Sequence, residues 1–276
     1  MKNDRGPIGI FDSGYGGLTI LREIRKMMPQ YDYLYLGDNA RTPYGTRSFD
    51  VVYEFTIQAV RYLFKQGCHL VILACSTASA RALRTIQQND LPRLAPNRRV
   101  LGVIRPTVEV IGDISKTHHV GIMATPGTVR SKTYELEIAK LFPDFKVTSE
   151  ACPMWVPLVE NEEYNTPGAD YFVKKNIDSL LQQDPQIDSV ILGCTHYPLL
   201  RDKIRQWMPD NIHVIEQGNY VAQSLKEYLS RHDDMSKHIT SEGTIRFLTT
   251  EQADVFQAKA AIFMDTAVEA ERVFLE

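Results

Sequence analysis

Two cysteines occupy matching places in a short pattern that the chain contains twice. Residues 71–77 read V-I-L-A-C-S-T and residues 190–196 read V-I-L-G-C-T-H, so Cys75 and Cys194 each end an apolar run and precede hydroxyl or imidazole groups. Ligands of open α/β sheets bind beyond the carboxyl ends of strands, where both thiols are predicted to lie. A following helix would favour a thiolate through its N–H groups and dipole. The repeat therefore indicates two functional groups that face one ligand from opposite sides.

The other two cysteines, Cys68 and Cys152, lack this setting. A buried cysteine is most often a packing residue, and both are interpreted in that way, although Cys152 and Pro153 could line a pocket. The four cysteines lie far apart without a C-x-x-C pair, which argues against a zinc ribbon or a redox dithiol. In a reducing compartment we expect four free thiols.

A glycine-rich stretch, F-D-S-G-Y-G-G-L at residues 11–18, follows the first predicted strand. It is not a dinucleotide fingerprint, because the last glycine of that motif would fall at Thr19. The glycines are expected to let the backbone approach a small anion at a helix start. Asp12 has two interpretations, a carboxylate that binds an ammonium group or handles a proton, and a simple helix cap.

Further polar groups follow other predicted strands. Pro43, Tyr44 and Gly45 could present backbone N–H groups to a ligand or form a plain turn, and residues 124–128 offer hydroxyls at a helix start. His196 could polarise Cys194 or donate a proton, or be structural. A P-loop, an H-E-x-x-H motif, zinc-ligand spacing and a G-x-S-x-G elbow are all missing from the sequence. The predicted site therefore uses thiols, carboxylates, hydroxyls and backbone dipoles, with neither a metal nor a cofactor.

The elements that position these groups alternate between short β-branched or aromatic runs and segments of helical period, the signature of an α/β fold. Strands without apolar alternation are typical of parallel sheets covered on both faces. The predicted strands are Ile8–Phe11, Tyr33–Leu36, Leu70–Ala74, Val100–Ile104, Val120–Ala124, Lys146–Glu150, Val190–Gly193, Val214–Glu216 and Ile245–Leu248. Helical faces are predicted around residues 21–28, 52–63, 134–142 and 173–181.

Two loop-like stretches, 89–99 and 207–211, suggest where the chain passes between domains. A length of 276 residues fits roughly two domains at about 150 residues each. We therefore expect a discontinuous first domain of residues 1–97 with 210–276, and a second domain of residues 98–209.

Composition limits the partners. With 31 Lys and Arg against 34 Asp and Glu, the chain has no basic excess for nucleic acid. No apolar run approaches the ~18 residues of a membrane span, so neither nucleic acid nor membrane is an expected partner and a cytoplasmic location is expected.

Taken together and in order, these blocks resemble the bacterial glutamate racemases, a group of cofactor-independent amino-acid racemases. The resemblance covers nearly the whole chain and is carried by residues 8–18, 38–45, 74–79, 152–153, 156–160 and 193–200. It implies two similar flavodoxin-like parallel-sheet domains, related by pseudo-two-fold symmetry, that hold glutamate in the cleft between them. It further implies that L- and D-glutamate are interconverted for peptidoglycan synthesis.

The resemblance also assigns roles to residues. Cys75 and Cys194 correspond to the two catalytic thiols, and Asp12 and His196 to the assisting acid and base. A racemase must remove the α-proton from one face and return a proton to the other, which agrees with the opposed groups indicated by the repeat. The implied substrate contacts are Asp12, Ser13, Tyr44, Gly45, Ser76, Thr77, Thr125, Thr128, Glu160, Thr195 and His196.

One departure and two alternatives accompany this interpretation. The family usually has Asn-Thr after the first cysteine, whereas this chain has Ser76 and Thr77, which questions how strongly the substrate is held. An aspartate or related racemase with the same thiol pair is one alternative, since only a methylene separates the substrates. A two-lobed amino-acid-binding protein without turnover is the other. The sequence is also compatible with a homodimer.

Overall fold

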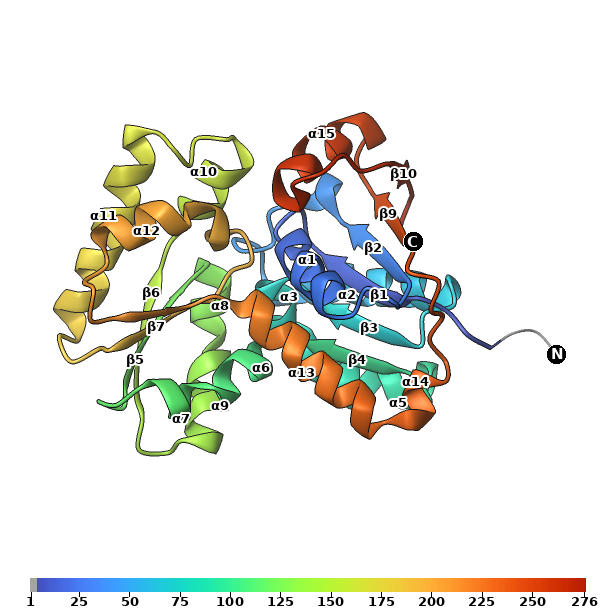
Figure 1. Ribbon diagram of the computed structural model, residues 1–276, viewed down its shortest axis with the longest axis horizontal. Helices are drawn as coiled ribbons and strands as arrows, with labels where there is room; N and C mark the ends of the chain where they lie inside the picture. The colour runs from blue at the N-terminus through green and yellow to red at the C-terminus, as the bar shows by residue number, and fades with distance from the viewer. Residues whose placement is uncertain (1–3) are drawn as a thin grey trace.

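The strands of the chain form two separate sheets, and all the pairings within them are parallel. A computed structural model describes residues 4–276 (Figure 1). The larger sheet has the order β10 (Ala270–Arg272), β9 (Ile245–Thr249), β2 (Tyr33–Gly37), β1 (Ile8–Asp12), β3 (Leu70–Leu73), β4 (Arg99–Gly102). The smaller has the order β6 (Lys146–Ala151), β5 (His119–Ala124), β7 (Ser189–Leu192), β8 (His213–Ile215).

The two sheets share one topology. The order β2-β1-β3-β4 in the first is repeated as β6-β5-β7-β8 in the second, which is the 2-1-3-4 order of flavodoxin-like folds. The predicted fold of two similar parallel-sheet units is confirmed. As a consequence β3, which leads to Cys75, is equivalent to β7, which leads to Cys194.

Helices cover both faces of each sheet (Figure 1), and this explains the unbroken apolar runs. Ile10 of β1 packs in one core cluster with Leu18 and Leu21, whereas the next residue, Phe11, belongs to a second cluster with Val60. Successive side chains of a strand point to opposite faces, so β1 contributes to both clusters.

The helices that cover the sheets differ in length. No helix among the described residues is both long and apolar enough to cross a bilayer. Those of eight or more residues are α1 (Gly17–Met27), α2 (Phe49–Lys65), α9 (Thr133–Leu141), α11 (Pro167–Gln183), α13 (Gln217–Arg231) and α15 (Ala253–Met264). The shorter ones are η1 (Asn39–Arg41), α3 (Ser76–Arg81), α4 (Leu83–Thr85), η2 (Ile86–Asp90), α5 (Leu91–Leu94), α6 (Ile104–Glu109), α7 (Ile111–Ile114), α8 (Pro126–Ser131), α10 (Trp155–Glu160), η3 (Tyr197–Leu200), α12 (Arg201–Trp207) and α14 (Asp233–Ser236).

The nine predicted strands are all present, with ends shifted by one or two residues. The edge strand β10 was not predicted, because its three residues, Ala-Glu-Arg, carry no apolar signal.

The predicted domain boundaries need a correction. Strand β4 pairs with β3, and β8 pairs with β7, so residues 99–102 belong to the first sheet and residues 213–215 to the second. Boundaries at 97/98 and 209/210 would assign each strand to the wrong sheet. The chain passes between the sheets after β4, near Val103, and again after β8, near Gln217.

Candidate active site

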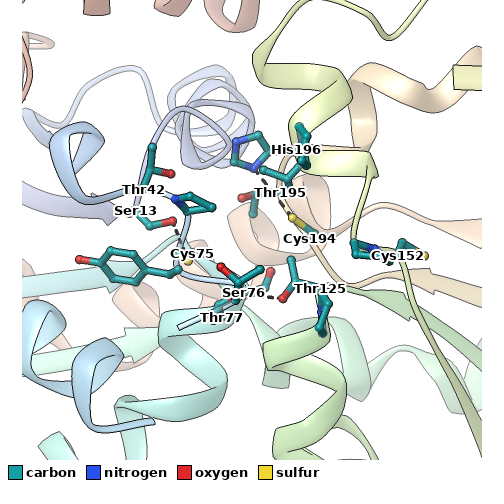
Figure 2. A pocket seen from close by; sticks show the side chains of 18 of the residues that line it. Ser13, Thr42, Cys75, Ser76, Thr77, Thr125, Cys152, Cys194, Thr195 and His196 are labelled. Carbon is teal, nitrogen blue, oxygen red and sulfur yellow. Dashed lines mark hydrogen bonds between the residues drawn. The ribbon is translucent and has the colours of Figure 1, made fainter. Parts of the chain in front are cut away.

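A cavity lies between the two sheets, beyond the carboxyl ends of β1, β3, β5 and β7 (Figure 2). Parallel pairing places these ends at one edge of each sheet, and the edges face each other. The predicted residues that line the cavity are Asp12, Ser13, Tyr44, Gly45, Cys75, Ser76, Thr77, Thr125, Cys194, Thr195 and His196. Thr42, Cys152 and Pro153 also line it, while Thr128 and Glu160 are not among the lining residues.

Cys75 is a buried thiol, 5% exposed, at the end of β3. Its Sγ lies 3.2 Å from Ser13 Oγ and accepts a hydrogen bond from the Ala78 N–H at 3.4 Å. Burial, reinforced by the Asp12 carboxylate, raises the pKa of Cys75 to about 12. The N-terminal N–H group of α3 was expected to favour a thiolate, but desolvation outweighs it and Cys75 is a protonated thiol.

Cys194 has a different partner. Its Sγ lies 3.8 Å from His196 Nδ1, and His196 Nε2 lies 3.0 Å from Glu160 Oε1. Burial alone would lower the pKa of His196, but the Cys194 and Glu160 contacts raise it well above its ordinary value. Burial likewise opposes ionisation of Glu160, yet His196, Lys259 and Thr42 lower the pKa of that carboxyl. The resulting imidazolium stabilises negative charge on the Cys194 sulfur.

Asp12 is buried, 1% exposed, with one oxygen committed. Its Oδ2 accepts from the Gly14 N–H at 2.9 Å, whereas Oδ1 has no hydrogen-bond partner among residues 4–276. Burial raises the pKa of Asp12, against the lowering effects of His196 and of the Gly17 N–H. Asp12 thus lies against the first residue of α1, but no side-chain cap hydrogen bond is formed at this helix start and one carboxylate oxygen stays unused. That oxygen can accept a hydrogen bond from a ligand.

Gly16 makes the approach of the second unit possible. A Cβ atom at this position would lie 2.4 Å from His196 Nδ1 and 2.5 Å from Thr195 Oγ1. The Thr19 hydroxyl, one turn further on, donates to the carbonyl oxygen of Thr195 at 3.0 Å. The space at Gly16 is therefore filled by side chains of the other unit, not by the small anion that the sequence suggested.

Three threonine hydroxyls meet beside the cavity, and two of them, those of Thr77 and Thr125, belong to residues that line it. Thr77 Oγ1 lies 3.0 Å from Thr125 Oγ1 and 3.3 Å from Thr128 Oγ1, and the latter two are 3.1 Å apart. Nearby, the Gly127 N–H donates to the carbonyl oxygen of Gly45 at 2.8 Å. Hydroxyls from both units thus converge where a carboxylate could accept hydrogen bonds from them.

Tyr44 and Glu160, both expected to contact substrate, are committed to protein partners. The Tyr44 hydroxyl donates to Asp38, which also accepts from Arg41 Nε at 2.7 Å. Burial and the Asp38 charge raise the pKa of Tyr44 well above its usual range. Tyr44 therefore offers the cavity its ring and backbone, and Glu160 acts on the cavity through His196.

One group of three side chains that could ligate a metal occurs among the described residues, namely Asp4, His69 and His238. It lies at the opposite end of the first sheet, because His69 directly precedes β3. The two imidazole rings are stacked, with centroids 4.6 Å apart and an angle of 17° between their planes. Ring-nitrogen lone pairs lie in the ring plane, so nearly parallel stacked rings cannot both direct them at one ion. We assign no metal site to this group.

The two thiols should differ in reactivity, because only the thiolate is an efficient nucleophile. Their exposed fractions are nearly equal, 5% for Cys75 and 6% for Cys194, so access alone does not separate them. We expect iodoacetamide to modify Cys194 before Cys75 at about pH 7.5, as measured by mass spectrometry of the peptides. Labelling of Cys75 should accelerate roughly tenfold per pH unit between about pH 7 and 10, below its pKa of about 12.

Cys68 is the internal control, because burial raises its pKa also to about 12 and it does not line the cavity. Modification of Cys75 first, at a rate independent of pH, would contradict the assignment of Cys194, beside the His196 imidazolium, as the more reactive sulfur.

Comparison with known proteins gives one consistent family. The Asp/Glu/Hydantoin racemase family model matches residues 18–225. Glutamate racemases of Ruegeria sp. and Jannaschia sp. are each 39% identical, over 93% and 96% of this chain and 96% and 99% of their own lengths.

Solved structures agree with these matches. A glutamate racemase of Bacillus anthracis has a TM-score of 0.90 at 32% identity, covering 99% of this chain and 98% of its own. That of Francisella tularensis, in complex with D-glutamate, has a TM-score of 0.87 at 30% identity and covers 99% of both chains. The Picrophilus torridus aspartate racemase shares only the fold, at 16% identity and a TM-score of 0.53. The chain belongs to the Asp/Glu/hydantoin racemase family, and within that family its matched relatives are glutamate racemases.

Proposed function

We propose that this chain interconverts L- and D-glutamate by moving the α-proton between two opposed thiols. The observation that carries the proposal is the pair of cysteines at equivalent strand ends, Cys75 after β3 and Cys194 after β7, both lining one cavity. The names of the matched relatives support glutamate as the substrate. The product D-glutamate would serve peptidoglycan synthesis, as it does for glutamate racemases generally.

The step needs one base and one acid on opposite faces of the α-carbon. A thiolate takes the α-proton, the electron pair is left on the α-carbon, and the opposite thiol then donates its proton to the other face. With Cys194 next to the His196 imidazolium and Cys75 protonated, Cys194 is placed to act as the base and Cys75 as the acid. This arrangement suits L-glutamate, for which the family resemblance makes Cys194 the base.

The cavity must also stabilise the developing negative charge. No lysine or arginine side chain lines the cavity. Apart from His196, the charge must therefore be stabilised by hydrogen bonds from hydroxyls and backbone N–H groups. Hydrogen bonds from preorganised donors to the substrate carboxylate gain strength in a buried, water-poor site. We propose that the hydroxyls of Thr77 and Thr125, supported from behind by Thr128, hold a carboxylate and that the free oxygen of Asp12 accepts from the ammonium group.

The direct test is a chiral assay on glutamate and aspartate with protein dialysed exhaustively against chelator and supplied with no pyridoxal phosphate. We expect both enantiomers of glutamate to converge on a racemic mixture and aspartate to react far more slowly. Activity on aspartate alone would favour the related racemase, and binding without turnover would favour an amino-acid-binding protein. Either result would refute the proposal.

The division of labour between the thiols predicts opposite defects. Replacement of either cysteine by serine raises the pKa of that group far above neutrality, so racemisation should fall by at least about a thousandfold in Cys75→Ser and in Cys194→Ser. Each variant keeps one base, which suffices to eliminate a leaving group from the β-carbon of a substituted glutamate. Cys75→Ser should process the L analogue and Cys194→Ser the D analogue.

The replacement Cys68→Ser is the matched control, since Cys68 is buried outside the cavity. The folded Cys68→Ser variant should keep the racemase activity of the wild type. If both active-site variants preferred the same enantiomer of the analogue, the two-thiol arrangement would be wrong.

A further inference from the structure

Gln217 is a buried amide, 2% exposed, at the first residue of α13, where the chain returns from the smaller sheet to the larger. Its Oε1 accepts from Ser76 Oγ at 2.8 Å. Its Nε2 donates to the Tyr134 hydroxyl at 2.9 Å and to the Val103 carbonyl oxygen at 3.3 Å. Val103 stands at the other crossing between the sheets, so one side chain connects both crossings to the residue after Cys75.

The network determines which way each group points. A backbone carbonyl can only accept, so the amide NH₂ of Gln217 must face Val103 and the amide oxygen must face Ser76. Ser76 must therefore donate its single hydroxyl proton to Gln217. Only acceptor lone pairs remain on the Ser76 oxygen, and Ser76 lines the cavity (Figure 2).

An acceptor at this place distinguishes the two ends of an amino acid. The α-ammonium group donates hydrogen bonds, whereas both carboxylates of glutamate only accept them. The unused oxygen of Asp12, in the same cavity, is a second acceptor. Thr77 and Thr125, which also line the cavity, supply hydroxyl donors. The cavity thus has acceptors, suited to an ammonium group, and donors suited to a carboxylate.

We propose that Gln217 is a positioning residue that holds Ser76 as a hydrogen-bond acceptor for the α-ammonium group of the substrate. Gln217 does not line the cavity and acts only through the Ser76 hydroxyl. The proposal rests on the proposed racemase function. Without Gln217 the hydroxyl of Ser76 could turn and present its proton to the ammonium group, which would remove the attraction.

The test uses Gln217→Met, which keeps the length of the side chain and removes both polar atoms. We expect the KM for glutamate to rise roughly tenfold, as for loss of a hydrogen bond to a charged group, with a smaller change in kcat. Glutarate, which has both carboxylates and no ammonium group, serves as a competitive inhibitor. Its inhibition constant should be unchanged, whereas a general loss of structure would weaken glutamate and glutarate alike.

Three further variants complete the design. Gln223→Met, at an exposed glutamine of the same helix, should match the wild type. Tyr134→Phe removes one of the two acceptors of the Gln217 amide and should raise the KM less than Gln217→Met, because Val103 still orients the amide. If Gln217→Met does not fold, as judged by circular dichroism, Gln217→Asn replaces it, since its shorter side chain keeps an amide but does not reach Ser76.

The outcomes separate the two proposals. Wild-type protein that fails to racemise glutamate refutes the proposed function. Wild-type activity combined with equal effects on glutamate and glutarate, or with no effect on either, refutes only the role of Gln217.

Discussion

Removal of water from the cleft is the constraint on which the chemistry of this molecule depends. Two thiols, a carboxylate and an imidazole are buried there together, and burial acts against the charged form of each. Cys75 responds by staying protonated, with a pKa raised to about 12. His196 remains charged because Glu160 and Cys194 contact its two ring nitrogens. The cleft can therefore hold one acid and one base of the same residue type, distinguished only by their neighbours.

This arrangement requires two units that meet closely, and the topology provides it. The repeated 2-1-3-4 strand order brings β3 and β7 to equivalent places, so their cysteines approach one cavity from opposite sides (Figure 2). Gly16 leaves room for His196 and Thr195 of the other unit. At the crossings, Gln217 joins Val103 and Ser76, so the contact between the units also orients a group in the cavity. Packing and chemistry thus share the same residues.

Features that depend on a local pattern of residues could be predicted from the sequence. Apolar runs without alternation predicted the parallel strands, and the repeated V-I-L-small-C pattern predicted both thiols at strand ends. Contacts through space could not be obtained in this way. Glu160 and His196 are 36 residues apart, and Ser76 and Gln217 are 141 apart, so nothing local indicated that they pair. The only signal for Gln217 was its place after the strand equivalent to β4. From the sequence, Ser76 was interpreted as a weaker substitute for the asparagine usual in the family. The sequence did not indicate its buried partner, Gln217.

The most direct test of the central claim follows deuterium during racemisation of L-glutamate in D₂O, stopped at low conversion. If two opposed thiols each serve one face, a proton removed by Cys194 is not returned to the same face, and the new proton comes from the exchanged thiol of Cys75. Mass spectrometry of the separated enantiomers should then find deuterium at the α-carbon of nearly all D-glutamate and in almost none of the remaining L-glutamate. Equal labelling of both enantiomers from the first turnovers would point to a single base that serves both faces and would contradict the account.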